Sequence, residues 1–144
     1  MVVSDGDFSQ LDCVKVYLTL AATAMDIRQK RVYDPPAPDD GFRVLIDGLW
    51  PRGVSHERAA LDLWARELAP SDGLRRWYGH EPERFEEFDG RYRAELAEQR
   101  ELLTELRRRA RSGRVTIVFG ARDAAHSNAT VVTDVLRRGL RRRP

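Results

Sequence analysis

Three short runs of apolar residues have the pattern of β-strands. The first, from Ile27 to Tyr33, alternates in polarity and must end before Pro35, because proline cannot donate a hydrogen bond to a neighbouring strand. The second, residues 42–46, begins at Phe42 or Arg43 and contains the continuous apolar run Val44-Leu45-Ile46. The third, residues 115–119, is apolar almost throughout, as expected of a central strand that is covered on both faces.

Between the second and third strands the apolar positions recur with helical spacing. One helix is predicted to follow an N-cap at Ser55 and to end before Pro70, with the apolar face Leu61, Trp64, Ala65 and Leu68. A second, short helix is predicted between an N-cap at Ser71 and a stop at Gly79, with Leu74, Trp77 and Tyr78 on one face.

A longer helical region begins at Pro82, since proline suits the first position of a helix. Its apolar stripe shifts phase, which predicts two helices or a kink near Glu98, and Ser112-Gly113 ends the region. The last helix is expected to be capped by Asp123. Its inner face should contain Val131, Val132, Val135 and Leu136, with Leu140 as a further candidate.

Strands that alternate with long helical stretches favour parallel pairing. We therefore predict an α/β fold, a small three-layer domain with a short, mostly parallel sheet of about three strands flanked by helices. Residues 25–140 form this single domain, and 141–144 form a basic tail. Residues 1–24 are interpreted as an N-terminal extension outside the fold rather than a secretory signal, because they begin acidic where a signal begins basic.

Composition and charge narrow the classes of function. The chain has 144 residues, 42% of them hydrophobic and 33% charged, as in globular proteins, and no apolar run approaches the roughly 20 residues that cross a bilayer. Cys13 is the only cysteine, which excludes a disulfide framework and a thiolate metal cluster, and a cytoplasmic location without membrane association is expected. Residues 26–136 carry 19 Lys and Arg against 20 Asp and Glu, whereas the last eight residues contain five Arg and no acid. Nucleic-acid binding is therefore not expected of the folded core, and the tail is left as its candidate site.

Candidate chemistry follows the second strand. Parallel strands bring their carboxyl ends to one edge of a sheet, where ligands bind in open α/β folds. Asp47 could act in acid–base or metal chemistry while Arg52 binds an anionic group. Alternatively, the two could form an internal salt bridge that fixes the turn, with Asp47 bonded to backbone amides. Trp50 could stack on a ligand or belong to the core.

A second group of polar residues follows the third strand. Arg122 is a candidate anion ligand beside the N-terminus of the last helix, and His126 is a candidate base. Asp123 and Asn128 complete this group, with Asp123 interpreted either as a ligand contact or as a helix cap only. No metal site is assigned, because the spacing of these residues matches no metal motif, and the sequence identifies no cofactor.

Several motifs, in this order and spacing, resemble those of the YeaO-like family of uncharacterised bacterial proteins, the domain of unknown function numbered 488. They are residues 30–36 (KRVYDPP), 49–53 (LWPRG), 68–71 (LAPS), 88–96 and 121–123 (ARD) with His126, and the match runs from about Met25 to Arg138. The resemblance implies a compact cytosolic α/β protein and supplies no reaction. The chain departs from the family pattern at Gly48, where an arginine is usual, and at Ser127, where an asparagine is usual.

The leading hypothesis is an anion-accepting crevice of a hydrolase or transferase that acts on a phosphate- or carboxylate-bearing small molecule. In it Arg52 and Arg122 bind, His126 is the base, and Asp47 orients or activates. The alternative is a non-catalytic binding module, for nucleic acid through the arginine-rich C-terminus or for a protein partner. A third hypothesis gives the motifs a purely structural role. The sequence leaves open whether the protein is an enzyme, and it does not give the oligomeric state.

Overall fold

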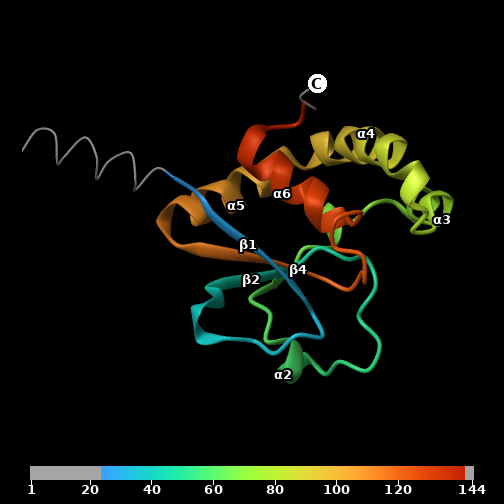
Figure 1. Cartoon of the computed structure of the whole chain (residues 1–144). Helices are drawn as coiled ribbons and strands as arrows, with labels where there is room; N and C mark the ends of the chain where they lie inside the picture. The colour runs from blue at the N-terminus through green and yellow to red at the C-terminus, as the bar shows by residue number, and fades with distance from the viewer. Residues whose placement is uncertain (1–23, 142–144) are drawn as a thin grey trace, which may run out of the picture.

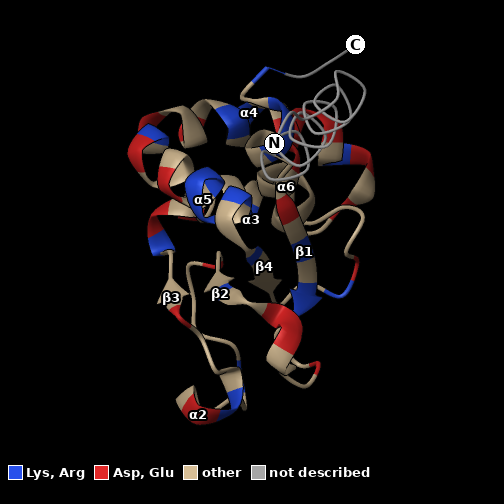
Figure 2. Ribbon diagram, turned by 90° about the vertical axis from the view of Figure 1, so that its left-hand side faces the viewer, with Lys and Arg blue, Asp and Glu red and all other residues tan. Residues whose placement is uncertain are grey.

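The computed structural model describes residues 24–141, so the predicted extension and most of the basic tail lie outside the described residues. Four strands form one parallel sheet in the order β1-β4-β2-β3 (Figure 1, Figure 2). Their bounds are β1 Asp26–Arg31, β2 Phe42–Leu45, β3 Leu63–Trp64 and β4 Arg114–Phe119. The predicted α/β class with a short parallel sheet is confirmed, and the sheet has a fourth strand beyond the three predicted.

The two faces of the sheet differ in what covers them (Figure 1). Four helices pack on one face: α3 (Asp72–Tyr78), α4 (Phe85–Leu96), α5 (Arg100–Ser112) and α6 (Asn128–Arg138). The opposite face is covered by the chain between β2 and β3, which contains the one-turn helix α2 (His56–Ala59). Short 3₁₀ turns, η1 Pro38–Asp40, η2 Arg66–Leu68, η3 Pro82–Arg84 and η4 Ala97–Gln99, complete the connections.

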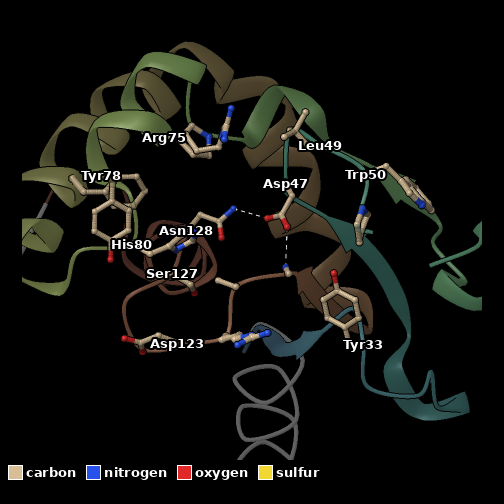
Figure 3. A pocket seen from close by; sticks show the side chains of 17 residues that line it. Tyr33, Asp47, Leu49, Trp50, Arg75, Tyr78, His80, Asp123, Ser127 and Asn128 are labelled. Atoms are coloured by element: carbon tan, nitrogen blue, oxygen red, sulfur yellow. Dashed lines mark hydrogen bonds between the residues drawn. The ribbon is translucent and has the colours of Figure 1, made fainter. Parts of the chain in front are cut away.

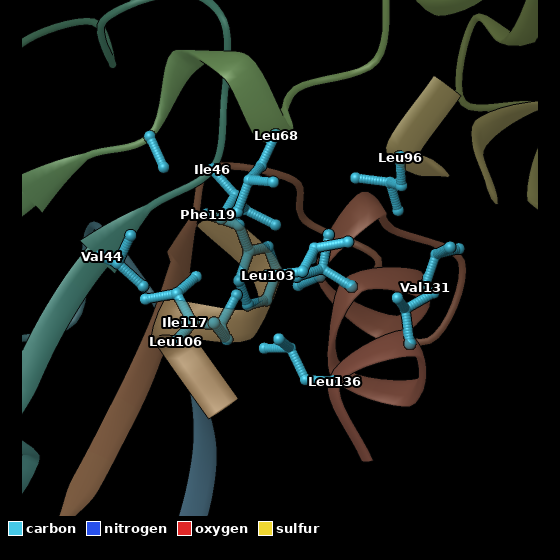
Figure 4. Packing of buried hydrophobic residues seen from close by; sticks show 14 of the residues in the cluster. Val44, Ile46, Leu68, Leu96, Leu103, Leu106, Ile117, Phe119, Val131 and Leu136 are labelled. Carbon is cyan, nitrogen blue, oxygen red and sulfur yellow. The ribbon is translucent and has the colours of Figure 1, made fainter. Parts of the chain in front are cut away.

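The main core lies between the sheet and the large helices (Figure 4). Ile117 and Phe119 of β4 point to this side, as do Val44 and Ile46, and they meet leucines of α5 and α6. Leu45 and Val118, one residue out of phase, face the smaller cluster on the opposite side. β4 is therefore buried on both faces, as its unbroken apolar sequence predicts.

The predicted helix across Leu61–Leu68 is wrong. Ser55 does cap a helix, since its side chain accepts from Arg58 N, but α2 ends after one turn at Ala60, which has a φ of 49°. The chain then forms β3, which pairs with β2, and the turn η2. An apolar spacing of three and four residues is thus satisfied here by a strand followed by a 3₁₀ turn.

The helices that follow agree with the sequence pattern. Ser71 caps α3, Gly79 ends it in the left-handed conformation, and η4 separates α4 from α5 at the predicted break. The predicted inner face of α6 is buried. Asp123 does not cap this helix, because α6 begins at Asn128, five residues later. Within residues 24–141, no helix combines the length and apolar character needed to cross a membrane.

Candidate functional site

A cavity of about 590 Å³ opens at the carboxyl ends of β2 and β4 (Figure 3). The residues that follow β2 form one side of it, and those that follow β4 and begin α6 form another. The turn before α3 and the end of α3 complete the wall. Members of both groups of polar residues that were predicted to meet at one edge of the sheet line this cavity, because adjacent parallel strands end together.

Asp47 lies at the floor of this cavity, with its carboxylate oriented by two donors (Figure 3). Gly120 N donates to Oδ2 at 2.8 Å, and Asn128 Nδ2 donates to Oδ1 at 2.9 Å. Burial raises the pKa of the Asp47 carboxyl, although these two hydrogen bonds and His80 act to lower it. Within residues 24–141, no arginine or lysine forms an ion pair with Asp47, so the salt bridge considered between Asp47 and Arg52 is not present.

Glycine at position 120 allows the close approach of the two strand ends. A Cβ atom built on Gly120 would lie 3.1 Å from Asp47 Oδ2, a contact tighter than ordinary packing. Gly48, where the family pattern has an arginine, lies beside the turn before α3, and its Cβ would be 3.3 Å from Ala69 Cβ. Both positions are therefore crowded around the floor of the cavity.

Trp50 forms part of one wall, and its indole is held from three sides. Nε1 donates to Val54 O at 2.6 Å, His56 stacks on the ring at 4.1 Å between centroids, and Trp64 packs against it edge-on at 5.2 Å. Trp64 in turn donates from Nε1 to the backbone oxygen of Asp47 at 2.7 Å. The two interpretations of Trp50 are thus compatible, because a packed ring also borders the cavity.

The cations at the rim differ in their partners. Arg122 lines the cavity with an exposed side chain, and no hydrogen bond or ion pair joins it to another residue in the described part of the chain. Arg75, on α3, approaches Asp72 at 3.6 Å, a long and exposed pair. Arg52 is exposed and is not among the residues that line the cavity.

His126 is also outside the lining of the cavity. Its ring pairs with the Asp123 carboxylate at 2.7 Å and meets Phe85 edge-on at 5.2 Å. The hydrogen bond from His126 is the main cause of a lowered pKa at Asp123. The His126 carbonyl accepts from Tyr78 Oη at 2.6 Å. Of the seven residues singled out in the sequence, the cavity brings together Asp47, Trp50, Arg122, Asp123 and Asn128.

The structure adds lining residues that the sequence did not single out. They include Tyr33, Pro70, Arg75, Tyr78 and His80. Tyr33 and Tyr78 lie on opposite sides of Asp47 in Figure 3. His80 had no special context in the sequence. In the structure it directly follows the helix end at Gly79, and both residues adopt positive φ. Among residues 24–141, no group of three or more histidine, cysteine, aspartate or glutamate side chains could hold a metal ion.

Comparison with known proteins identifies the family. A family model described as "Inactive DUF488-N3 subclade" matches residues 26–144. The chain is 43% identical over 110 residues to the uncharacterized protein Rv3073c of Mycobacterium tuberculosis and, to the same extent, to Mb3100c of Mycobacterium bovis. These matches cover 76% of this chain and 92% of each relative. The uncharacterized protein YeaO of Escherichia coli is 38% identical over 113 residues, or 78% of this chain and 98% of YeaO. No solved structure matches the chain. The chain therefore belongs to the DUF488 family, and the resemblance to YeaO-like proteins inferred from its motifs is confirmed.

Proposed function

We propose that the protein is a small-molecule binding module whose cavity takes an organic anion, with an apolar body and a phosphate or carboxylate group, without converting it. The observation that carries this proposal is Arg122, a guanidinium at the rim of a formed cavity with no partner of its own among the described residues. Arginine binds phosphates and carboxylates through two parallel hydrogen bonds. An anionic ligand would supply the partner that the protein lacks at this position.

The size and walls of the cavity support a ligand larger than an inorganic ion. Binding sites for organic ligands commonly enclose about 300–1,000 Å³ and have mostly apolar walls with a few polar groups. The cavity of about 590 Å³ falls in this range, and its apolar wall residues include Leu49, Trp50, Pro51, Pro70 and Tyr78. An apolar body would pack against these side chains while its charged group stays near the rim.

Binding without conversion is favoured over the hydrolase or transferase hypothesis for three reasons. The proposed base, His126, is turned onto Asp123 outside the cavity lining, and Arg52 is outside it as well. The hydroxyl groups of Ser127 and Tyr78, which do line it, donate to backbone carbonyls and to no histidine or carboxylate. The family model also carries the word "Inactive" in its description.

Nucleic-acid binding is the weaker alternative. Most elements of the described part of the chain carry both basic and acidic residues, although the second half of α5 is basic, with Arg107, Arg108, Arg109 and Arg111 (Figure 2). A nucleic-acid surface concentrates Lys and Arg on one face. The arginine-rich end of the chain lies mostly outside the described residues. Removal of residues 141–144, which lie after the end of α6, separates the two functions, because it should leave small-molecule binding unchanged.

The test is calorimetric titration of the full chain with nucleoside monophosphates, sugar phosphates and aromatic carboxylates. Arg122→Ala should weaken binding of the best ligand about 10- to 100-fold, as expected for one charge-assisted hydrogen-bonding group. The matched control is Arg108→Ala, which removes an exposed arginine of α5 that pairs with Glu105. Absence of binding by every compound, or equal loss in both variants, would refute the proposal. Turnover of a bound phosphate ester would refute its non-catalytic part.

A further inference from the structure

The side-chain amide of Asn128 has only one orientation that fits its neighbours. Nδ2 donates to Asp47 Oδ1 at 2.9 Å and to Ile46 O at 3.3 Å. Both partners are acceptors, so the reversed amide would bring oxygen against oxygen. The two N–H bonds of Asn128 are thereby used within the protein, and its Oδ1 is left for the cavity.

The oxygen of Asn128 is open to a ligand. No hydrogen bond within residues 24–141 reaches this atom, and none of the described buried side-chain oxygen or nitrogen atoms lacks a partner. Oδ1 is therefore accessible, and in Figure 3 it points away from Asp47. Asn128 Oδ1 and the carboxylate oxygens of Asp47 therefore lie close together, and all of them are hydrogen-bond acceptors.

Asp47 and Asn128 together make a floor that only accepts hydrogen bonds. Each carboxylate oxygen of ionised Asp47 accepts one hydrogen bond from the protein and has capacity for another. A ligand group that approaches this floor must donate, since a phosphate or carboxylate oxygen would be repelled. The anionic group and the donating group of the ligand must then be different groups, one near Arg122 and the other at Asp47.

We infer that the ligand is a planar nitrogen heterocycle that carries two adjacent N–H donors on one edge and an anionic tail, the chemistry presented by guanine nucleotides. This inference rests on the proposed function, because it assumes that the cavity binds an anion. Two neighbouring donors match the two oxygens of a carboxylate, as in bidentate pairs. The planar body fits the aromatic and proline walls, which include Tyr33, Pro51 and Pro70.

The decisive comparison uses guanosine monophosphate and inosine monophosphate in calorimetric titrations of the unaltered full chain. The two compounds differ only in the exocyclic amino group, so the ring, the sugar and the phosphate are constant. Loss of that donor leaves an ionised acceptor at the floor unmatched, and we expect inosine monophosphate to bind about 10- to 100-fold more weakly. Guanosine without phosphate should also bind more weakly, because Arg122 then has no partner.

Asp47→Asn provides the matched variant. An asparagine presents only one acceptor, so the preference for guanosine monophosphate over inosine monophosphate should fall toward one, whereas the effect of the phosphate should remain. Thermal unfolding of the variant checks that it is folded. The comparison in the unaltered protein decides the question even if this variant does not fold.

The outcomes separate this inference from the proposed function. Equal binding of guanosine and inosine monophosphates overturns the donor-edge inference and leaves anion binding intact. Free arginine, which has two donors and a carboxylate but no planar ring, overturns the heterocycle if it binds as tightly as guanosine monophosphate. If other anions bind in an Arg122-dependent manner and guanosine monophosphate does not, the inference alone fails. If no anion binds at all, both fail.

Discussion

Asp40 is predicted to hold the chain between β2 and β3 onto the sheet. Its carboxylate is almost fully buried and accepts from Lys30 Nζ at 2.8 Å, from Arg43 Nη1 at 2.6 Å and from Ala37 N at 2.9 Å. Arg43, also buried, donates from Nη2 to Ala59 O at 2.8 Å. The pair thereby joins η1 and β2 to the end of α2, whose segment includes the Trp50 wall of the cavity.

Asp40→Asn should reduce the free energy of unfolding by about 3–5 kcal/mol, the usual cost of removing one partner from a buried ion pair. The substitution conserves volume, so the loss reports on charge and not on a cavity. Domains of this size unfold at about 5–15 kcal/mol, so the change is large. Burial acts to raise the pKa of Asp40, but the hydrogen bonds from Lys30, Ala37 and Arg43 outweigh it and leave the pKa lowered.

The assay is urea unfolding followed by tryptophan fluorescence, with Asp39→Asn as the matched control. Asp39 is highly exposed and lies 3.6 Å from Arg114, so its loss should cost less than about 1 kcal/mol. A depressed folded-state pKa means that the stability from Asp40 is present above the unfolded-state pKa and is lost as pH falls through the folded-state value. The variant and the parent should therefore converge in acid.

A second substitution sharpens the test of the ion pair. Arg43→Met added to Asp40→Asn removes the buried charge that has lost its carboxylate and should recover part of the lost stability, reduced by the loss of the hydrogen bonds to the Ala59 and Ala60 carbonyls. A loss below about 1 kcal/mol for Asp40→Asn, or a loss equal to that of Asp39→Asn, would refute the reasoning. The Asp40 carboxylate would then not be what holds the segment between β2 and β3 onto the sheet.

Three further predictions concern backbone space, helix ends and the floor of the cavity. Gly41→Ala should lower the free energy of unfolding in urea by at least about 2 kcal/mol, because φ is +66° and the new Cβ would lie 2.2 Å from Arg114 O. The control, Gly90→Ala, lies in open space within α4 and should raise it by up to about 1 kcal/mol, so equal effects of the two substitutions would contradict the geometry. Arg107→Met should lower the free energy of unfolding by about 1–2 kcal/mol, because Nη2 and Nε of Arg107 donate to the Val135 and Leu136 carbonyls near the end of α6. The control is Arg108→Met, which removes an exposed ion pair with Glu105 and should change stability little. The pKa of Asp47, measured by carbon NMR, should lie above that of an ordinary aspartate because the carboxyl is buried, and a pKa at or below the ordinary value would contradict this argument. The contribution of Asp47 to stability should accordingly fall as pH rises through the folded-state pKa.

The parts of the fold that the sequence predicts are those set by local patterns. The unbroken run of β4, the caps of α3 at Ser71 and Gly79, and the break at η4 each depend on neighbours within a few residues. β3 was missed because it has only two residues and exists through pairing with β2. Asp62 N donates to Arg43 O, and Ala65 N donates to Leu45 O, across 19 and 20 positions of sequence. No local pattern reports such partners.

The candidate site was predictable in location and less so in content. Parallel topology is enough to bring Asp47 and Asn128 together, since both follow strands that end at one edge. The directions of side chains in the connecting turns are not set by topology. His126 turns onto Asp123 because their spacing of three residues closes a local hydrogen-bonded turn, and Arg52 points outward just before a glycine with positive φ.

Asp47 differs from the other buried carboxylates in how its charge is matched. Asp40 and Asp89, the two acids that are almost fully buried, each form an ion pair with an arginine. Asp47 lies at the floor of a cavity and is oriented by a backbone N–H and an amide, which are neutral donors. Burial without an ion-paired arginine or lysine disfavours the ionised form, and it outweighs the hydrogen bonds and His80, which act to lower the pKa of Asp47. The fold pairs Asp40 and Asp89 with its own arginines, whereas Asp47 faces the cavity. We therefore expect the ligand to supply the hydrogen-bond donors that Asp47 lacks.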